Sequence, residues 1–511
     1  MNDKYYITTP IYYVNDKPHI GHAYTTILAD VLSNYNKIIG NQTYFLTGTD
    51  EHGQKVESAA KEKNISPIEQ CNQTVVRFQD LWNKLGITND DFIRTTEERH
   101  IKVVKLILQE LFDKNEIYKG EYKGWYCESS EQFLTEKELN DENSPDYGRP
   151  VESIVESNYF FKMSKYQDWL IDYIERNPNF IQPDFRANET LGFLKSKKLQ
   201  DLCISRPKRR LKWGIELPFD NEFVTYVWFD ALINYISSIG YKSDENLFNS
   251  LWPCSCHLIG KDILTTHTVY WPIMLKAIGL ELPKTIFAHG WWLTGKTKMS
   301  KSLGNVVNPI DLIEKYDVDS FRFFLLSEMT LGQDSSFTED AFIRRYNADL
   351  ANDFGNLVNR VLNMMNRYCE GKIPKHHYFD NNEEILWDGM QKSISFMKES
   401  ILNMKINVGI EKVMDASRSI NKYLETKAPW TAFKNGYIED VETTLYISAE
   451  CLRVVSEILY PLMPKKMNIV RESLGLTNKI VSLNEIGKYG QILVNSKINQ
   501  PDVLFPRIEI K

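Results

Sequence analysis

The sequence has 511 residues, too many for one compact core, so we expect about two to four domains. A net charge of −7 excludes a generic polyanion binder, although local basic potential can still bind nucleic acid. The seven cysteines are odd in number and widely spaced, which argues against a disulfide framework and favours a reducing compartment. We find no targeting leader and no apolar run that could span a membrane, so we predict a cytoplasmic protein without a membrane partner.

The first elements predict a β-α-β unit. Residues 5–14 are β-branched and aromatic, which is typical of a buried strand. Apolar residues then recur at helical spacing over residues 27–39, and Gly40 occupies a C-cap position. Residues 43–46 predict a second strand that ends in Thr47-Gly48-Thr49-Asp50. Two such strands are expected to run parallel, joined by a right-handed crossover.

The remaining chain predicts an interrupted α/β domain followed by helices. Polar turn signals over residues 115–222 indicate an insertion, after which residues 223–227, 257–259 and 285–288 resume the strand pattern. Helical spacing dominates from about residue 345, with an irregular tail after Tyr489. The predicted fold is a Rossmann-like parallel-sheet catalytic domain (residues 1–114 and 223–344), split by a connective insertion (115–222), and an all-α helical-bundle domain (345–511).

Pro18-His19-Ile20-Gly21-His22 lies where the first strand meets the first helix. A helix N-terminus attracts anions, and two histidines can donate hydrogen bonds to phosphate oxygens. Gly21 leaves room for a flat base to lie close to the backbone. By itself the pattern also fits a helix start with two exposed histidines.

Lys298-Met299-Ser300-Lys301-Ser302, followed by Leu303-Gly304-Asn305, predicts a basic loop that contains a glycine. Two lysines and two hydroxyls can close on a triphosphate and neutralise the charge that builds on departing pyrophosphate. Alone, the segment also fits a solvated basic turn, as does the basic run from Arg206 to Lys212.

The two motifs together, in this order, resemble the paired signatures of class I aminoacyl-tRNA synthetases. The match tightens over residues 10–22, 47–53, 226–235, 259–267 and 298–305, which are similar to the methionyl-tRNA synthetase family. The resemblance continues to Leu504-Phe505-Pro506-Arg507 and so covers essentially the whole chain. It implies activation of methionine with ATP and Mg²⁺, followed by transfer to tRNA(Met).

The positions of the candidate residues agree with this resemblance. In open α/β sheets, ligands bind outside the carboxyl ends of the strands. Tyr13, Asp50, Trp228 and Asp262 each follow a predicted strand, and the lysine loop follows Ala288. We therefore expect them at one edge of one sheet.

The resemblance implies two sets of substrate-binding residues. Aromatic walls suit a polarisable thioether, and the Ile11 backbone and the Asp50 carboxylate would hold the methionine ammonium group. Leu232 departs from the proline of some relatives, which changes the shape of that wall. The methionine set is Ile11, Tyr13, Asp50, Trp228, Leu232, Tyr235, Ile263 and His267. The ATP set is His19, Gly21, His22, Gly260, Asp262, Lys298, Ser300 and Lys301, among which His19, His22, Lys298 and Lys301 are the expected catalytic residues.

The resemblance also places anticodon recognition in the helical domain. Asn356 and Arg360 are one helical turn apart, and Trp430 follows Ala428-Pro429 as a platform for an unstacked base. These three residues would read the CAU anticodon of tRNA(Met), although Trp430 alone also fits an aromatic that packs on the bundle. Relatives that dimerise carry a further tRNA-binding module, so we expect a monomer.

Two other patterns suggest alternative sites. Residues 290–297 fit the P-loop spacing, but two tryptophans suit it poorly, and no helix is predicted to start at Lys296-Thr297. Cys254-Ser255-Cys256-His257 continues into a buried strand, which favours structural thiols.

Many relatives have a zinc knuckle with two Cys-x-x-Cys pairs in the insertion. Here the four ligand positions hold Cys127, Ser130, Ser144 and Tyr147. One thiol, two hydroxyls and a phenol cannot supply the thiolate or imidazole ligands of a structural zinc site. We therefore predict a metal-free lobe with a small core of Phe133, Leu134 and Leu139.

Three rival functions remain open at this level. Synthetases for leucine, isoleucine or valine share the fold but are much longer. A small-molecule nucleotidyltransferase shares the histidine motif but does not need the helical domain. A non-catalytic tRNA-binding paralogue would not need intact signatures.

Overall fold

The computed structural model describes residues 3–14, 17–127, 132–134, 151–295, 297–298, 307–477 and 482–509. The chain forms two compact units. The first, here the sheet unit, comprises Lys4–Pro18 and Tyr44–His289. The second, here the helical unit, comprises Met1–Asp3, His19–Thr43 and Gly290–Lys511. The domain boundaries expected from the sequence stay predictions.

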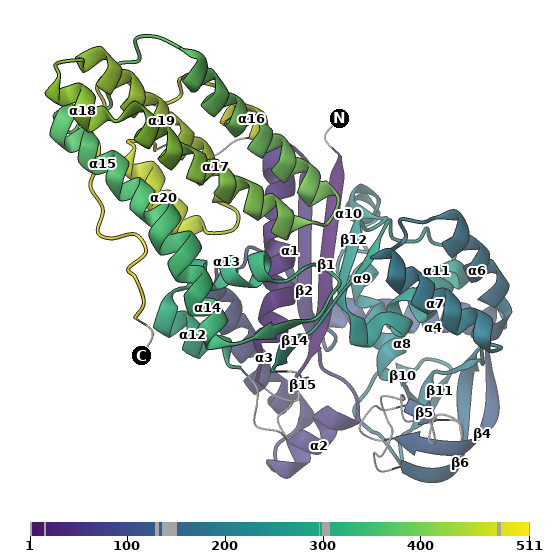
Figure 1. The fold of residues 1–511 in the computed structure, drawn as a ribbon. Coiled ribbons are helices and arrows are strands. Elements are labelled where there is room, and N and C mark those ends of the chain that lie inside the picture. The colour runs from purple at the N-terminus through teal and green to yellow at the C-terminus, as the bar shows by residue number, and fades with distance from the viewer. Residues whose placement is uncertain are drawn as a thin grey trace. The chain divides into compact units, whose positions relative to one another are not determined.

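The sheet unit is built on a six-stranded sheet whose paired strands run parallel (Figure 1). Its order is β3 (Asp91–Arg94), β2 (Gln42–Asp50), β1 (Lys4–Tyr13), β12 (Cys256–Gly260), β13 (Ile286–His289) and β7 (Ile181–Gln182). The chain leaves β1 on one side toward β2 and later returns on the other side as β12. This reversal of strand order is where open α/β sheets bind ligands. The predicted parallel-sheet fold is confirmed.

Helices complete the core of the sheet unit. Ser66 caps α3 by accepting a hydrogen bond from the Glu69 backbone amide, and Gly86 ends the helix in the left-handed region, with φ 69°. The longer helices are α2 (Gln54–Glu62), α3 (Pro67–Leu85), α4 (Glu98–Asp113), α6 (Gln167–Arg176), α7 (Asp184–Ser196) and α11 (Trp271–Ile278). Three short helices, α8 (Val227–Leu232), α9 (Asn234–Ser237) and α10 (Glu245–Leu251), precede β12.

The predicted insertion contains regular structure. β4 (Ile117–Cys127) and β6 (Val151–Phe161) form a long antiparallel pair, flanked by β5 (Gln132–Leu134) and β8 (Leu202–Cys203). A separate three-stranded sheet contains β9 (Ser205–Pro207), β10 (Glu216–Leu217) and β11 (Asp220–Thr225).

The prediction that residues 223–227 resume the parallel sheet was wrong. β11 pairs antiparallel with β9 and β10, and α8 already begins at Val227. A run of β-branched and aromatic residues predicts a strand, but it contains no information about which sheet the strand joins.

In the helical unit, α1 (Ile20–Ile39) begins earlier than the apolar spacing alone indicated, at the histidine motif. Gly40 is its C-cap with φ 109°, as predicted. Two buried contacts connect α1 to other parts of this unit. The Tyr35 hydroxyl donates to the Ile458 carbonyl at 2.7 Å, and Asp30 pairs with Arg322 at 2.6 Å.

The helical unit confirms the all-α prediction for the C-terminal part of the chain, and its small sheet lies before residue 345. The helices are α12 (Pro309–Tyr316), α13 (Val318–Glu328), α14 (Glu339–Arg345), α15 (Asn356–Tyr368), α16 (Asn381–Leu402), α17 (Ile406–Lys427), α18 (Pro429–Lys434), α19 (Ile438–Leu459), α20 (Pro464–Ser473) and α21 (Leu483–Ile486), with a π-helical turn at Tyr346–Gly355. In Figure 1, α16 and α17 run side by side, and α19 is buried almost throughout its length. Among the described residues, no helix is long and apolar enough to cross a membrane.

The small sheet of the helical unit excludes a P-loop at residues 290–297. β14 (Trp292–Thr294) lies between β16 (Ser335–Phe337) and β15 (Thr297–Lys298). Thr297 and Lys298 therefore continue as a strand, where a P-loop needs the start of a helix. A β-carbon on Gly290 would lie 2.0 Å from the Gln333 carbonyl oxygen, so this glycine allows close backbone packing.

Candidate functional site

The carboxyl ends of the central strands carry the candidate residues of the sheet unit. β1 ends at Tyr13, β2 at Asp50, β12 at Gly260 and β13 at His289. Because paired strands are parallel, these ends share one edge of the sheet. Trp228 does not follow a strand of this sheet, since it lies on α8. The predicted clustering by strand end therefore holds for Tyr13, Asp50 and Gly260, but not for Trp228.

Tyr235 and His267 form the centre of an aromatic group. The Tyr235 hydroxyl and His267 Nε2 are 2.8 Å apart, and each side chain is only 1% exposed. His267 Nδ1 lies 3.0 Å from the Ile263 carbonyl, which can only accept a hydrogen bond. Nδ1 therefore carries the hydrogen, and Nε2 accepts from Tyr235. Burial lowers the pKa of His267 to about 4, so the imidazole is neutral near pH 7.

Other predicted methionine residues surround this group. The Trp228 ring stands edge-on to His267, with centroids 6.1 Å apart. Ile11, Trp228, Leu232 and Ile263 belong to the same hydrophobic cluster as Tyr235, and Leu232 is fully buried there. These surfaces are apolar and aromatic, as a thioether requires.

Tyr13 does not belong to this hydrophobic cluster. It packs against a smaller cluster with Val14, Val56 and Cys71, and its hydroxyl donates to the His52 carbonyl at 2.7 Å. The family resemblance grouped Tyr13 with the other aromatics, and its contact with methionine stays a prediction.

Asp50 ends β2 and begins a turn that several hydrogen bonds hold. Its backbone carbonyl accepts from the Val14 amide at 3.2 Å, and its side chain is buried. The adjoining Glu51 carboxylate accepts from Arg94 Nε at 2.7 Å and also from Thr96. The Glu51 backbone carbonyl accepts a hydrogen bond from the Trp213 indole N–H at 2.5 Å. The turn can therefore hold a carboxylate in one place for a cationic ligand.

A buried network beside this turn was not predicted. Asp230 Oδ2 accepts from His52 Nδ1, and Asp230 Oδ1 accepts from His100 Nε2, each at 2.7 Å. Burial raises the pKa of the Asp230 carboxyl, but the charge and hydrogen bonds of His52 and His100 outweigh this and hold it below its ordinary value. His52 and Asp230 both lie in segments that carry the family resemblance. No sequence spacing connects them, because their contact depends on the fold.

Gly260 and Asp262 form a tight turn after β12. A β-carbon on Gly260 would lie 2.6 Å from Asp262 Oδ1. The glycine therefore lets the carboxylate fold back over the strand end. The contact of these two residues with ATP stays a prediction.

In the helical unit, His19 and His22 form a capping box at the start of α1. His19 Nδ1 accepts from the Gly21 amide at 3.0 Å, and His22 Nδ1 accepts from the His19 amide at 3.2 Å. The neutral rings therefore carry their hydrogen on Nε2, the tautomer that can donate to phosphate. The rings stack with centroids 3.8 Å apart. A β-carbon on Gly21 would lie 2.9 Å from the His19 ring, so glycine permits this stack.

The lysine loop begins and ends inside the helical unit. Lys298 lies on β15, whereas Ser300 and Lys301 lie outside the described residues. On the far side of the loop, the Val307 carbonyl accepts a hydrogen bond from the Ile20 amide at 3.3 Å. Beside β15, the Trp292 ring on β14 stands edge-on to Tyr24 of α1, with centroids 6.0 Å apart. Both flanks of the loop are therefore adjacent to the helix that carries the histidine motif.

The predicted anticodon residues occupy one surface of the helical unit. Arg360 lies over the Trp430 ring at 5.0 Å from its centroid and pairs with Glu425 at 2.7 Å. Trp430 is 37% exposed, and Asn356 is exposed one turn before Arg360 on α15. The structure thus brings Arg360 and Trp430 into contact. Their role stays a prediction.

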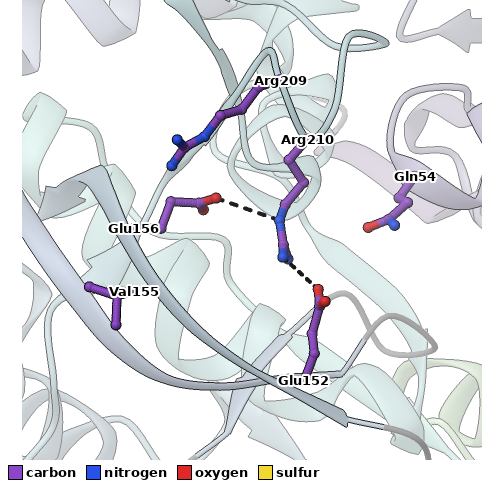
Figure 2. A pocket seen from close by; sticks show the side chains of 6 residues that line it. All are labelled: Gln54, Glu152, Val155, Glu156, Arg209 and Arg210. Carbon is purple, nitrogen blue, oxygen red and sulfur yellow. Dashed lines mark hydrogen bonds and ion pairs between the residues drawn. The ribbon is translucent and has the colours of Figure 1, made fainter.

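The basic run of the insertion is largely paired. Arg210 reaches between Glu152 and Glu156, as Figure 2 shows. Its guanidinium nitrogens lie 2.5 Å from Glu152 and 3.5 Å from Glu156, at a pocket of about 430 Å³. Lys208 pairs with Glu216 at 2.6 Å, and Arg206 is buried over Tyr226. Arg209 is exposed beside this pocket. Internal pairing of this kind favours a solvated face over a bare phosphate-binding patch.

The sulfur-containing candidates for a metal site lie in different surroundings. Cys127 is buried at the end of β4, whereas Ser130, Ser144 and Tyr147 lie outside the described residues. The predicted small core of Phe133, Leu134 and Leu139 is likewise not described at the level of side chains. Cys254 donates to the Tyr6 carbonyl at 3.1 Å, and burial raises the pKa of Cys256 to about 12. Cys254 and Cys256 are therefore buried structural thiols.

A parallel α/β sheet, a histidine-capped helix and a helical bundle together define a class I tRNA synthetase. Two family models match the chain: "tRNA synthetases class I (M)" over residues 5–148 and 136–362, and "Anticodon binding domain of methionyl tRNA ligase" over residues 373–511. The chain belongs to the methionine–tRNA ligase family, as the paired motifs predicted.

Individual relatives agree with this assignment. The methionine–tRNA ligase of Clostridium tetani is 44% identical over 100% of this chain and 80% of its own. That of Rickettsia bellii is 42% identical over 100% of both chains. The solved Mycobacterium tuberculosis methionyl-tRNA synthetase in complex with methionyl-adenylate has a TM-score of 0.94 at 35% identity, covering 99% of this chain and 100% of its own. The rival synthetases, the nucleotidyltransferase and the non-catalytic paralogue are not supported by these matches.

Proposed function

We propose that this chain activates methionine with ATP and transfers the methionyl group to the 3′-terminal ribose of tRNA(Met). The observation that supports methionine most directly is the aromatic group of Tyr235, His267 and Trp228 beside a buried carboxylate turn. The aromatic faces suit the thioether, and Asp50 suits the ammonium group.

The first step joins a methionine carboxylate oxygen to the α-phosphorus of ATP and breaks the bond to pyrophosphate. His19 and His22 donate through Nε2 to phosphate oxygens, consistent with the tautomers that their Nδ1 contacts require. Lys298, Ser300 and Lys301 neutralise the departing pyrophosphate, and Gly260 and Asp262 bind the nucleotide. No strong protein base is needed, because positioning and charge stabilisation lower the barrier.

In the second step, a ribose hydroxyl of the tRNA attacks the methionyl carbonyl, and AMP leaves. In the first step, Mg²⁺ would enter with ATP and would supply positive charge for its phosphate groups. Tyr13, Leu232, Ile263 and the Ile11 backbone complete the amino-acid site.

Amino-acid-dependent ATP–pyrophosphate exchange, measured across the proteinogenic amino acids, tests the proposal. Methionine should give the highest kcat/KM. Homocysteine should also be activated, because one methyl group contributes only about 1–3 kcal/mol in a pocket. Faster exchange with any other proteinogenic amino acid would overturn the assignment.

The role of the lysine loop has its own test. Lys301→Ala should lower the single-turnover rate of adenylate formation much more than it weakens methionine binding. An unchanged single-turnover rate would contradict the role in pyrophosphate departure. Lys315→Ala, which removes an exposed lysine on α12, is a matched control in the same unit.

The remaining expectations are proposals of the same kind. The tRNA partner carries a CAU anticodon that Asn356, Arg360 and Trp430 contact, and the protein works as a cytoplasmic monomer. Light scattering at about twice 59.7 kDa would contradict the monomer.

The insertion binds no zinc, because Cys127, Ser130, Ser144 and Tyr147 offer one thiolate only. Elemental analysis of chelator-washed protein that found one equivalent of zinc would contradict this.

A further inference from the structure

The buried carboxylate Asp230 connects the segments that carry the candidate methionine residues of the sheet unit. His52 belongs to the turn after β2, His100 to α4 and Asp230 to α8. His100 Nδ1 continues the chain of contacts to Ser237 Oγ on α9, at 2.8 Å. All four side chains are buried, and Asp230 and His100 are fully inaccessible.

The spacing along the chain relates this network to the predicted pocket. Asp50 lies two residues before His52, Trp228 lies two residues before Asp230, and Tyr235 lies two residues before Ser237. Each of these pocket candidates is thus held by a short backbone segment that ends at a network residue. Tyr13 joins the same turn, because its hydroxyl donates to the His52 carbonyl.

Both carboxylate oxygens of Asp230 are engaged by separate elements, at 2.7 Å each. A buried ionic group contributes little net stability, because desolvation offsets its attraction. It does fix geometry, since each oxygen accepts from one donor in one direction. Errors of about 0.5 Å in a binding site are enough to weaken ligand recognition.

We propose that His52, Asp230, His100 and Ser237 are positioning residues that set the spacing of Asp50, Trp228 and Tyr235 and thereby determine affinity for the amino-acid substrate. The proposal rests on the proposed function. The four side chains are buried, so the network acts through the turn after β2 and through α8 and α9. Loss of the network should weaken binding of the amino-acid substrate. It should leave ATP binding nearly unchanged, because none of the candidate ATP-binding residues lies on these segments.

Asp230→Asn in the full-length chain is the main test, read by pyrophosphate exchange with each substrate varied in turn. We expect KM for methionine to rise about 10–100-fold, the range that outer partners contribute when they orient metal ligands. KM for ATP should stay within about twofold. Equal rises in both KM values would overturn the proposal, because general loosening of the fold affects both substrates.

His100 separates a positioning role from a packing role. His100→Leu removes the donor to Asp230 and should raise KM for methionine, whereas His100→Gln keeps an amide donor and should restore most of the affinity. α4 carries none of the candidate pocket residues, so direct contact with methionine cannot explain this result. Equal KM values for the two variants would overturn the proposal.

Glu450→Gln is the matched control in the helical unit. Glu450 is a buried carboxylate that accepts from Arg453 at 2.8 Å and from the backbone amides of Gln491 and Ile492. The Glu450→Gln variant should have a lower Tm than wild type and an unchanged KM for methionine. If KM for methionine follows Tm across Glu450→Gln and the network variants alike, the network is merely structural.

Substitute variants and a measurement of amino-acid preference separate failure of this proposal from misfolding and from failure of the proposed function. Should Asp230→Asn fail to fold, His100→Leu and Ser237→Ala carry the test, with His100→Gln as the variant that keeps the donor. The wild-type amino-acid preference is measured in the same experiment. A preference for another amino acid refutes the proposed function, and the network is then judged on KM for that amino acid.

Discussion

The candidate methionine pocket and the candidate anticodon surface differ in how far their side chains are buried before a ligand binds. Tyr235 and His267 are each 1% exposed and hydrogen-bonded to one another. Trp430 is 37% exposed, and Arg360 reaches across it to an exposed glutamate. A small ligand makes few contacts, so its pocket must be shaped in advance. An RNA loop supplies unstacked bases that become buried when it binds. Exposed side chains of the protein can therefore exchange their protein partners for RNA bases.

Asp50→Asn should have the largest effect, and it should act on the pocket side of this comparison. Removing one partner of a buried charged hydrogen bond costs about 2–5 kcal/mol, so exchange kcat/KM for methionine should fall by about 30-fold or more. Charging of tRNA should fall by a similar factor, because it needs the adenylate.

Asp388→Asn, a change of the same chemistry at an exposed position on α16, should leave both activities unchanged. Loss of charging with normal exchange in Asp50→Asn would contradict the ammonium role of Asp50.

Trp430→Ala acts on the anticodon side and should separate the two activities. Base stacking on an aromatic side chain contributes about 1–3 kcal/mol, so kcat/KM for tRNA should fall about 5- to 150-fold. Methionine-dependent exchange should not change. Phe396→Ala, an exposed aromatic on α16, is the control. If Trp430→Ala lowers exchange as well, Trp430 has a structural role.

The sequence predicted those parts of the site that depend on local patterns. The capping histidines, Gly40 and the strand ends at Tyr13 and Asp50 follow from spacing within one or two elements. The antiparallel sheet of β11, the placement of Tyr13 in a separate cluster and the contacts of Asp230 depend on distant segments. Hydrophobic periodicity fixes which face of an element is buried, but not which element covers it.

Two buried groups, one in each unit, should respond oppositely to acid. Burial lowers the pKa of His267 in the sheet unit to about 4, below the ordinary 6.5. Between these values the unfolded chain binds a proton that the folded chain does not, so stability falls as pH drops. Burial raises the pKa of Asp319 in the helical unit to about 6, above the ordinary 3.8. There the folded chain binds the proton, so stability rises as pH drops from about 6.

Urea unfolding at pH 7 and pH 5 measures these two contributions. On going from pH 7 to pH 5, His267 should lower the free energy of unfolding by about 2 kcal/mol, and Asp319 should raise it by about 1 kcal/mol. His267→Asn should therefore reduce the loss of stability at pH 5, and Asp319→Asn should increase it. Identical pH dependence in wild type and both variants would show that neither group titrates in this way.

The smallest expected effect tests whether the anticodon surface exchanges partners. Arg360 pairs with Glu425 at 2.7 Å, and the Glu425 side chain is 62% exposed. An exposed ion pair contributes only about 0.2–1 kcal/mol, so RNA can displace it at little cost. Glu425→Gln releases Arg360 beforehand and should lower KM for tRNA by up to about fivefold, without any change in exchange. Glu411→Gln removes the same charge from an exposed position on the same helix, α17, so the difference between the two variants isolates the release of Arg360. A higher KM for tRNA in Glu425→Gln would instead mean that Glu425 holds Arg360 in the orientation that the anticodon needs. The anticodon surface would then be preorganised in the same sense as the methionine pocket.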